Sequence, residues 1–441
     1  MKIAIIGAGF GGMAAAYDLA LAGQDVTIYE AADHVGGLAA GFKEPHWDWS
    51  VEKFYHHWFA SDEHMLGLID ELGWSDKVLF PRPYTVLQYN EKWYPFDSIL
   101  NALRYPGLGW GVNKIRFGFV GLYLRLSSNW RSLEKYTVGE WMRKWAGKSV
   151  YEKMWQPLVI GKFGPHAEDV NMAWMWARLK ARTTRLGTFE GGFQAFADAF
   201  AEKLGGMDVT IQLNTPISAI TQSNGQLEIQ TSEGQASFDQ VLSTTSPSLL
   251  AKLAPDLPQS YLKGLLELKS MGAVVMTLAL KQQVSTQGYY WYNLPKDAGY
   301  PFLAMVEHTN YVSPEHFGGE HILYCGDYLE ISAPQVGLPL GTYDRGSLVA
   351  LPPEQRAIYA DHLQRVMPDG GQMLLLTFEY DQDQVGGPPF NVPQAEVQAL
   401  YGCRCRVELL ETGTTDVVPP HFTEAGVTSA LEGVYHITKE H

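Results

Sequence analysis

The sequence predicts an α/β protein that begins with a parallel β-strand, an α-helix and a second parallel strand. Three observations support this fold class. A short apolar run, Lys2–Ile6, leads directly into a glycine-rich loop. Apolar β-branched runs then alternate with helical periodicity along the 441 residues. The composition finally changes abruptly near residue 330, which indicates a second α/β part.

The composition excludes several classes of protein. With 33 basic and 48 acidic residues the formal net charge is −15, so a nucleic acid is disfavoured as a partner. The three cysteines form no disulfide framework, and no histidine cluster accompanies them to make a metal site. Low cysteine use favours the cytoplasm. No uncharged apolar window reaches the ~18 residues of a membrane-spanning helix, and the glycine-rich N-terminus with Asp18 does not read as a signal peptide.

The glycine-rich loop has the residues that a bound dinucleotide requires. Gly7 permits the tight turn out of the strand, Gly9 lets the backbone approach a pyrophosphate, and Gly12 lets helix and strand pack closely. A helix is expected over Met13–Ala22, and its N-terminus offers free N–H groups and the positive end of its dipole to phosphates. The strand, loop and helix therefore predict a Rossmann-like nucleotide-binding unit rather than an unrelated glycine-rich turn.

The residues after the helix decide between cofactors. The second strand, Asp25–Tyr29, ends at Glu30, whose carboxylate can accept hydrogen bonds from both ribose hydroxyls and disfavours the 2′-phosphate of NADP. A second glycine pair, Gly36-Gly37, follows. This order resembles the FAD-binding start of the amine oxidase, protoporphyrinogen oxidase and phytoene desaturase superfamily. Many of its members have Arg where this chain has Leu38. The resemblance implies FAD rather than NAD.

The resemblance also implies an activity and a set of cofactor contacts. Members transfer a hydride from a small, often apolar, organic substrate to flavin N5. The backbone near Ile217 would meet the adenine. The residues expected to bind FAD are Gly7, Gly9, Phe10, Gly11, Gly12, Glu30, Ala31, Gly36, Gly37, Leu38 and Ile217.

A segment dense in aromatic and histidine residues, 46–59, follows the glycine pair. The resemblance implies that it passes beside the flavin ring, whereas an aromatic core segment with satisfied histidines is the alternative. His56 and His57 are adjacent, so on a strand they would face opposite sides and at most one would face the flavin. Lys53, His56 and His57 are the candidates for the flavin face, and no catalytic base is assigned.

The middle of the chain predicts a substrate domain. Residues 94–175 show helical periodicity, and segment 105–126 combines Phe117, Phe119 and Leu122 with Lys114 and Arg116. A basic amphipathic helix of this kind can lie on a membrane surface. A substrate-domain helix with a solvated basic face is the favoured alternative.

The chain is then expected to return to the FAD-binding part. Residues 187–193, followed by a helix to Leu204, resemble the returning segment of the superfamily. Later strands are expected at 209–213, 217–220, 227–231, 238–243 and 271–280. The expected domains are residues 1–92 and 187–250 for FAD, 93–186 and 251–330 for substrate, and 331–441 as a C-terminal segment.

The composition break lies near Glu330. All thirteen tryptophans lie at or before Trp291, and of nineteen lysines only Lys439 lies after Glu330. Leu323–Asp327 resembles the strand that closes the flavin site in the superfamily. However, Ile331-Ser332-Ala333-Pro334 follows where a helix should begin. We therefore expect the closing flavin motif to be missing.

The residues after the break resemble a different enzyme. The runs 342–353 and 387–393 are similar to the C-terminal half of bacterial thiopurine S-methyltransferase, over about residues 335–441. The first half of that family, which holds S-adenosylmethionine, is absent, so a partial class I methyltransferase-like α/β segment is expected. Arg345 matches an Arg near the family's substrate pocket, with a surface or packing Arg as the favoured alternative.

Three functions are therefore compared. The first is an FAD-dependent oxidoreductase, the second a thiopurine S-methyltransferase-like protein, and the third an inactive chimera that only binds nucleotide. A natural fusion, a recombinant chimera and a sequence-assembly join stay open, and the substrate, electron acceptor and oligomeric state do not follow from the sequence.

Overall fold

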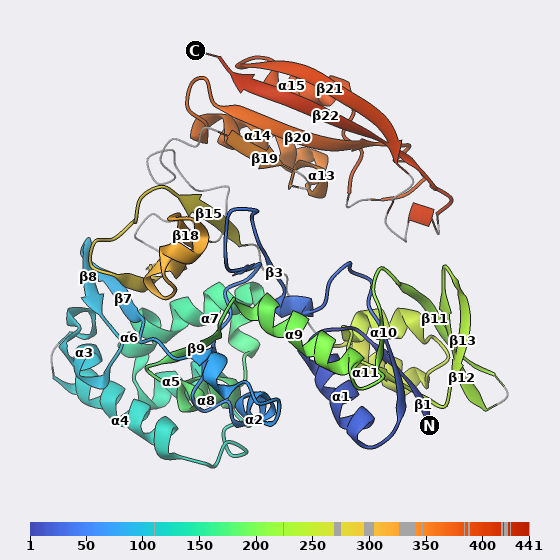
Figure 1. Cartoon of the computed structure of the whole chain (residues 1–441). Helices are drawn as coiled ribbons and strands as arrows, with labels where there is room; N and C mark the ends of the chain where they lie inside the picture. Colours follow the sequence, from blue (N-terminus) through green and yellow to red (C-terminus); the bar gives the residue numbers. More distant parts are fainter. Residues whose placement is uncertain are drawn as a thin grey trace. The chain divides into compact units, whose positions relative to one another are not determined.

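The computed structural model describes residues 1–109, 111–223, 225–268, 275–294, 304–325, 341–344, 347–382, 384–386, 389–415, 418, 422–423 and 425–440. Contacts divide the chain into two units, Met1–Ala298 with Leu303–Gly326, and Gly299–Phe302 with Asp327–His441 (Figure 1). Arg345 and the residues around the expected closing motif, 326–340, lie outside the described residues.

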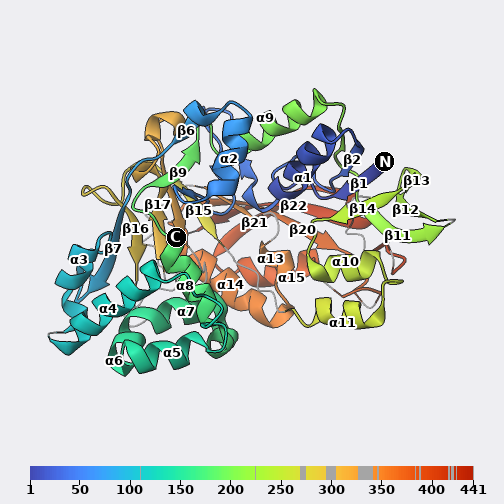
Figure 2. The same cartoon turned by 90° about the horizontal axis from the view of Figure 1, so that it is seen from below.

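A parallel sheet opens unit 1. Its strands in spatial order are β10 (Thr210–Gln212), β2 (Asp25–Tyr29), β1 (Lys2–Ile6) and β14 (Gln240–Ser243). Helices α1 (Phe10–Leu21) and α9 (Phe193–Gly205) pack side by side on it (Figure 2). Met13, Phe196 and Ile28 are fully buried between helices and strands. Strands apolar on both faces are what a parallel sheet covered by helices requires.

A small antiparallel sheet follows, where a hairpin was expected. It consists of β11 (Ile217–Ser223), β12 (Gln226–Thr231) and β13 (Gly234–Phe238). Phe238 is the last residue of β13, whereas we expected it to begin the buried strand. Its side chain packs against Tyr29 of the parallel sheet. Helices α10 (Pro247–Leu253) and α11 (Gln259–Leu266) come next, and Leu253 is buried with Ile220 of β11.

A six-stranded sheet forms the second half of unit 1. Its order is β15 (Met276–Leu280), β18 (His321–Cys325), β17 (Ala304–Glu307), β16 (Tyr289–Asn293), β7 (Tyr84–Tyr89) and β8 (Lys92–Pro95). β16 and β7 run parallel, and the other pairs are antiparallel. β18, the strand that imitates a closing flavin strand, therefore belongs to this sheet and not to the parallel one. The division of unit 1 into FAD-binding and substrate domains stays a prediction.

Helices and short strands complete unit 1. Residues Val120, Leu124, Met142 and Val159 form the core of the helical part. Among the described residues no helix is long and apolar enough to cross a membrane. The helices are α2 (Glu63–Glu71), α3 (Ile99–Arg104), α4 (Val112–Leu126), α5 (Val138–Trp145), α6 (Lys148–Val150), α7 (Gln156–Phe163) and α8 (Met172–Ala181), and the strands are β3 (Gly41–Phe42), β4 (Val51–Glu52), β5 (Trp58–Phe59), β6 (Val78–Leu79) and β9 (Leu186–Phe189).

The described part of unit 2 contains a four-stranded sheet and three helices. Its order is β19 (Gly341–Asp344), β20 (Gln372–Glu379), β22 (Ala430–Lys439) and β21 (Cys405–Thr415), with only β19 and β20 parallel. The helices are α13 (Ser347–Ala350), α14 (Pro353–Val366) and α15 (Gln394–Tyr401). Arg356, which is almost fully buried, joins α14 to α15 through Nη1, 2.7 and 2.8 Å from the two carboxylate oxygens of Glu396. In the described part of the chain β19 pairs with β20 alone.

Glu52 is a buried acid that ties together the two halves of unit 1. It ends β4, and its carboxylate accepts the N–H of Phe193 at the start of α9 (3.1 Å) and the hydroxyl of Tyr324 on β18 (3.4 Å). The side chain is only 2% exposed. Burial raises the pKa of Glu52 from 4.5 to about 7, against the opposing effect of these hydrogen bonds. The folded protein therefore holds a proton on this carboxyl over several pH units in which the unfolded chain does not.

The close packing of α1 on β1 makes Gly12→Ala a test of the fold. A Cβ at Gly12 would lie 2.0 Å from the carbonyl oxygen of Gly7, so the helix must move away from the strand. We expect the free energy of unfolding in urea to fall by about 1–3 kcal/mol or more. Gly67→Ala is the matched control, because a Cβ at this exposed position of helix α2 would meet no atom within 4 Å. Its free energy of unfolding should rise by about 0.5–1 kcal/mol. Equal stability of Gly12→Ala and the parent would contradict this packing.

Glu52→Gln tests the buried acid through the pH dependence of stability. Because the folded pKa is raised, the proton on Glu52 stabilises the fold fully below pH 4.5, and this contribution is lost as the pH rises to about 7. The loss is about 1.4 kcal/mol per pH unit. A neutral glutamine has no such proton to lose. The free energy of unfolding of the variant, relative to that of the parent, should therefore rise by about 2–4 kcal/mol between pH 5 and pH 8.

Urea unfolding at the two pH values measures this difference. Glu44→Gln, which replaces an exposed acid, is the control and should follow the parent. If Glu52→Gln and Glu44→Gln show the same pH dependence, Glu52 does not carry a raised pKa.

Candidate functional site

The glycine loop and the glycine pair form one continuous backbone surface. The N–H of Gly36 donates to the carbonyl oxygen of Ala8 (2.9 Å), and Gly9 and Gly36 form a parallel β-bridge. A Cβ at Gly37 would lie 3.1 Å from the Cα of Gly9, and Gly36 and Gly37 both have positive φ, 110° and 57°. A side chain at Gly37 would therefore press on the glycine loop, whereas one at Gly36 would meet Ala40 and Ala197. The structure thus brings the two sequence motifs together.

The N-terminus of α1 is open at this surface. The helix begins at Phe10, three residues before the expected start at Met13, because the glycines Gly11 and Gly12 already adopt helical backbone. Gly9 precedes the helix and supplies no side-chain cap. Gly11 is exposed, and a Cβ there would meet nothing within 4 Å. The first N–H groups of α1 are therefore placed for an anion such as a phosphate.

The side chain of Phe10 is engaged elsewhere. Its ring packs edge-on against Phe196, 5.1 Å between centroids, and lies 6.4 Å from the ring of Phe193 at the start of α9. The ring of Phe10 thus packs against α9, while its backbone N–H lies at the start of α1.

Glu30 is held at the end of β2 by two backbone donors. Its carboxylate accepts the N–H of Ala8 (2.8 Å) and the N–H of Ala32 (2.9 Å), one on each oxygen. A carboxylate has about four acceptor positions, so each oxygen can accept one more bond, as from a ribose hydroxyl. The N–H of Thr215 donates to the carbonyl oxygen of Glu30 (2.8 Å), which brings the chain near Ile217 beside Glu30 and Ala31.

Leu38 adds no charge to this site. It lies in a single 3₁₀ turn, Gly37–Ala39, directly after the glycine pair, and its side chain is 85% exposed. A phosphate near the pair would therefore rely on backbone donors and the dipole of α1.

The structure does not bring Lys53, His56 and His57 together. His56 and His57 lie in irregular chain between β4 and β5, so the expected strand alternation is wrong here. Lys53 Nζ lies 3.1 Å from Nε2 of His34, at the surface. His56 Nδ1 hydrogen-bonds the carbonyl oxygen of Phe54. Burial, with the charges of Arg182 and Arg178, lowers the pKa of His57 to about 4. His57 is therefore neutral at pH 7.

The surroundings of His57 are cationic. Burial lowers the pKa values of Lys162, Arg178 and Arg182, and the charge of Arg178 lowers those of Lys162 and Arg182 further. Arg182 keeps solvent-accessible surface although protein surrounds it. Among the described residues none of the three has a carboxylate within ion-pair distance. Three cations therefore lie near one another without a neutralising acid, and solvent screens the exposed Lys162 and Arg182.

Aromatic rings surround Tyr55, two residues before His57. Tyr55 lies edge-on to Trp291 of β16, with 4.8 Å between ring centroids, and 6.3 Å from Tyr324 of β18. Sequence reasoning missed Glu52 and Tyr324 as partners. The sequence at Glu52 showed only an acid beside Val51 within the segment rich in aromatic residues.

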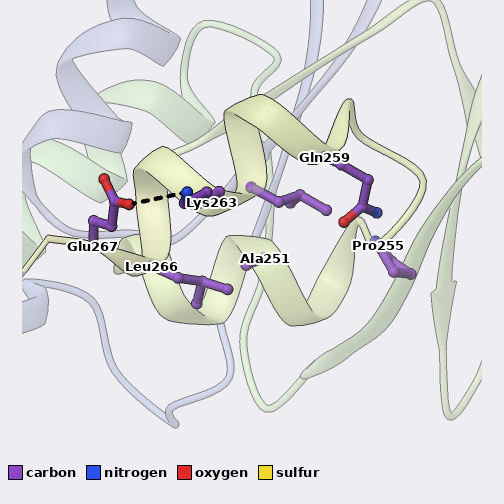
Figure 3. Close-up of a pocket in the computed structure, with 7 residues that line it drawn as sticks. Ala251, Pro255, Gln259, Lys263, Leu266 and Glu267 are labelled. Atoms are coloured by element: carbon purple, nitrogen blue, oxygen red, sulfur yellow. Dashed lines mark ion pairs between the residues drawn. The ribbon is translucent and has the colours of Figure 1, made fainter.

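A shallow pocket of about 460 Å³ lies elsewhere on unit 1, between α10 and α11 (Figure 3). Lys263 and Glu267 in its lining form an exposed ion pair at 3.9 Å. None of its lining residues belongs to the glycine loop or the glycine pair; they are Ala251, Pro255, Gln259, Leu262, Lys263, Leu266 and Glu267. In the described part of the chain no group of acidic, histidine or cysteine side chains could hold a metal ion.

Solved structures share the fold of this chain. An oxidoreductase from Methanosarcina mazei superposes with a TM-score of 0.60 at 16% identity, covering 83% of this chain and 82% of that one. A putrescine oxidase bound to putrescine gives 0.57 at 17% identity, covering 83% and 81%. At these identities the likeness concerns the fold, a Rossmann-like FAD/NAD(P)-binding domain with an inserted α+β domain.

Curated relatives match the other end of the chain. The thiopurine S-methyltransferase of Nitrosospira multiformis is 38% identical over 135 residues, 29% of this chain and 61% of that protein. The enzyme of Pseudomonas fluorescens is 44% identical over 115 residues, 26% and 52%. The thiopurine S-methyltransferase family matches residues 305–440. The chain thus spans little more than half the length of these relatives, and unit 2 is a partial methyltransferase-like α/β segment.

The family described as flavin containing amine oxidoreductase matches residues 10–331, which is well over half of the chain. The joined glycine segments, the open N-terminus of α1 and the free acceptor positions of Glu30 fit the ADP half of FAD. FAD is the cofactor of this protein, and the chain belongs to the flavin containing amine oxidoreductase family.

Proposed function

We propose that this chain is an FAD-dependent oxidoreductase that takes a hydride from a small organic substrate. The observation that carries the proposal is the single backbone surface made by the glycine loop and the glycine pair, with Glu30 fixed beside it. FAD supplies the hydride-accepting chemistry when bound. The chain supplies binding, orientation and electrostatics.

The proposed contacts follow from the geometry. The N–H groups of Phe10, Gly11 and Gly12 at the start of α1 face the pyrophosphate, and Glu30 accepts the ribose hydroxyls. Gly7, Gly9, Gly36 and Gly37 provide close backbone approach, and the chain at Ala31, Leu38 and Ile217 borders the cofactor.

The surroundings of His57 favour a neutral or anionic substrate over a protonated amine. Arg182 and Arg178 raise the local potential around His57, which would repel an ammonium group. Tyr55 and Trp291 offer apolar ring surface nearby. Neutral His57 can accept or donate a hydrogen bond but carries no charge at pH 7. We assign no catalytic base.

Methyl transfer is the second candidate, favoured by the identity of unit 2 to thiopurine S-methyltransferases. We propose that unit 2 does not bind S-adenosylmethionine. It corresponds to the last part of those enzymes, and no loop for the methionine end precedes β19 in the sequence. A non-catalytic chimera that keeps a nucleotide-binding shell is the third candidate, and it predicts a colourless purified protein.

Replacement of Glu30 tests the cofactor site. Glu30→Ala removes charge-assisted hydrogen bonds to the ribose, each worth about 1.5–3 kcal/mol, so the Kd for FAD should rise at least ~10-fold. Glu30→Gln keeps an acceptor without the charge and should lie between Glu30→Ala and the parent. Asp18→Ala, which replaces an exposed acid on α1, is the control and should bind FAD as the parent does. Titration of the FAD-free protein by fluorescence measures all three, and unchanged affinity in Glu30→Ala rules out the ribose contact.

Calorimetric titration of the whole protein with S-adenosylmethionine tests the second candidate. We expect no binding heat, because unit 2 lacks the half of the methyltransferase fold that holds the cofactor. A bacterial thiopurine S-methyltransferase titrated in parallel is the positive control. Tight binding to this chain would overturn the assignment.

A further inference from the structure

Helix α4 exposes an apolar stripe along its outer face. Five apolar side chains recur at spacings of three and four residues, so they lie on one side of the helix. Each is between 53% and 71% exposed. They are Val112, Ile115, Phe119, Leu122 and Leu126. A contiguous exposed apolar surface of this kind marks an interaction site.

Core packing does not explain this stripe, because the opposite face of α4 already packs against unit 1. Val120 and Leu124 are buried in the core of the helical part. Phe117, which the sequence grouped with the outer aromatic residues, stacks on Trp155 with 5.6 Å between centroids. The helix lies at the outer edge of the helical part of unit 1 (Figure 1). It is therefore anchored by one face and offers the other.

Aromatic residues connect α4 to α5 beside the stripe. Tyr123 of α4, which is 40% exposed, stacks on the buried ring of Trp141 at 5.9 Å. Trp141 lies 6.2 Å from Trp145, which is half exposed. The ammonium group of Lys144 lies over the Trp145 ring at 5.5 Å. Exposed rings beside a cation suit the boundary between water and a membrane.

The helical part of unit 1 is strongly basic in an acidic protein. Residues 99–186 contain 15 Lys and Arg against 5 Asp and Glu, whereas the whole chain has 33 against 48. Helix α4 itself carries Lys114, Arg116 and Arg125 and no acidic residue. A second copy of this chain would bring two basic faces together, and their repulsion opposes docking of α4 on α4.

We propose that the outer face of α4 binds an anionic lipid bilayer, with the helix lying in the plane of the headgroups. The apolar stripe enters the boundary of the acyl chains, and the surrounding lysines and arginines face anionic headgroups. This surface is independent of FAD binding and of the identity of the substrate.

Sedimentation of the full-length protein with lipid vesicles tests the proposal. Vesicles of phosphatidylcholine with an equal part of phosphatidylglycerol should bind the protein, and vesicles of phosphatidylcholine alone should bind it at least ~10-fold more weakly. High salt should weaken the binding, since it screens the headgroup attraction.

The variant Ile115→Gln/Phe119→Gln removes the centre of the stripe without touching the core. It should lose ~10-fold or more of the apparent affinity for the anionic vesicles. Ile358→Gln, in α14 of unit 2, replaces an isoleucine that is 59% exposed and is the matched control, which should bind as the parent does. Unchanged thermal unfolding of each variant shows that the fold is intact.

Failure of the parent to bind the anionic vesicles would overturn the proposal, as would equal binding by Ile115→Gln/Phe119→Gln. A dimer of the parent in light scattering that this variant dissociates would assign the stripe to a second copy of the chain instead.

Discussion

The close approach of two glycine segments is the constraint on which the cofactor site depends. Gly9 and Gly36 pair as backbone, and a Cβ at Gly37 would lie only 3.1 Å from the Cα of Gly9. This contact fixes the N-terminus of α1 next to the chain that leaves β2. Glu30 can then bridge the N–H groups of Ala8 and Ala32 while keeping acceptor positions for a ribose.

The first forty residues could be predicted from sequence because their pattern is local. A strand, a glycine loop, a helix and an acid follow one another within one βαβ unit, and the spacing alone defines the geometry. The segment at His56 and His57 could not be predicted in the same way. Its strand neighbour β5 exists because Trp58 pairs with Gly187, far along the chain, so the local pattern carried no information about it.

Glu52 shows the same limit for electrostatics. Its burial depends on Phe193 and on Tyr324, which stands 272 residues away, and no sequence pattern reports such a contact. The outer face of α4 was only partly visible in the sequence: the basic and apolar residues were evident, but which rings face solvent is decided by packing. The methyltransferase-like character of the C-terminal segment could be predicted, because the runs 342–353 and 387–393 are specific local motifs.

This chain binds FAD at the joined glycine segments although its C-terminal unit resembles part of another enzyme. The visible absorption spectrum of the purified full-length protein tests FAD binding most directly. We expect the bands of an oxidised flavin, which dithionite bleaches. A protein that remains colourless after incubation with FAD and removal of the excess would contradict it.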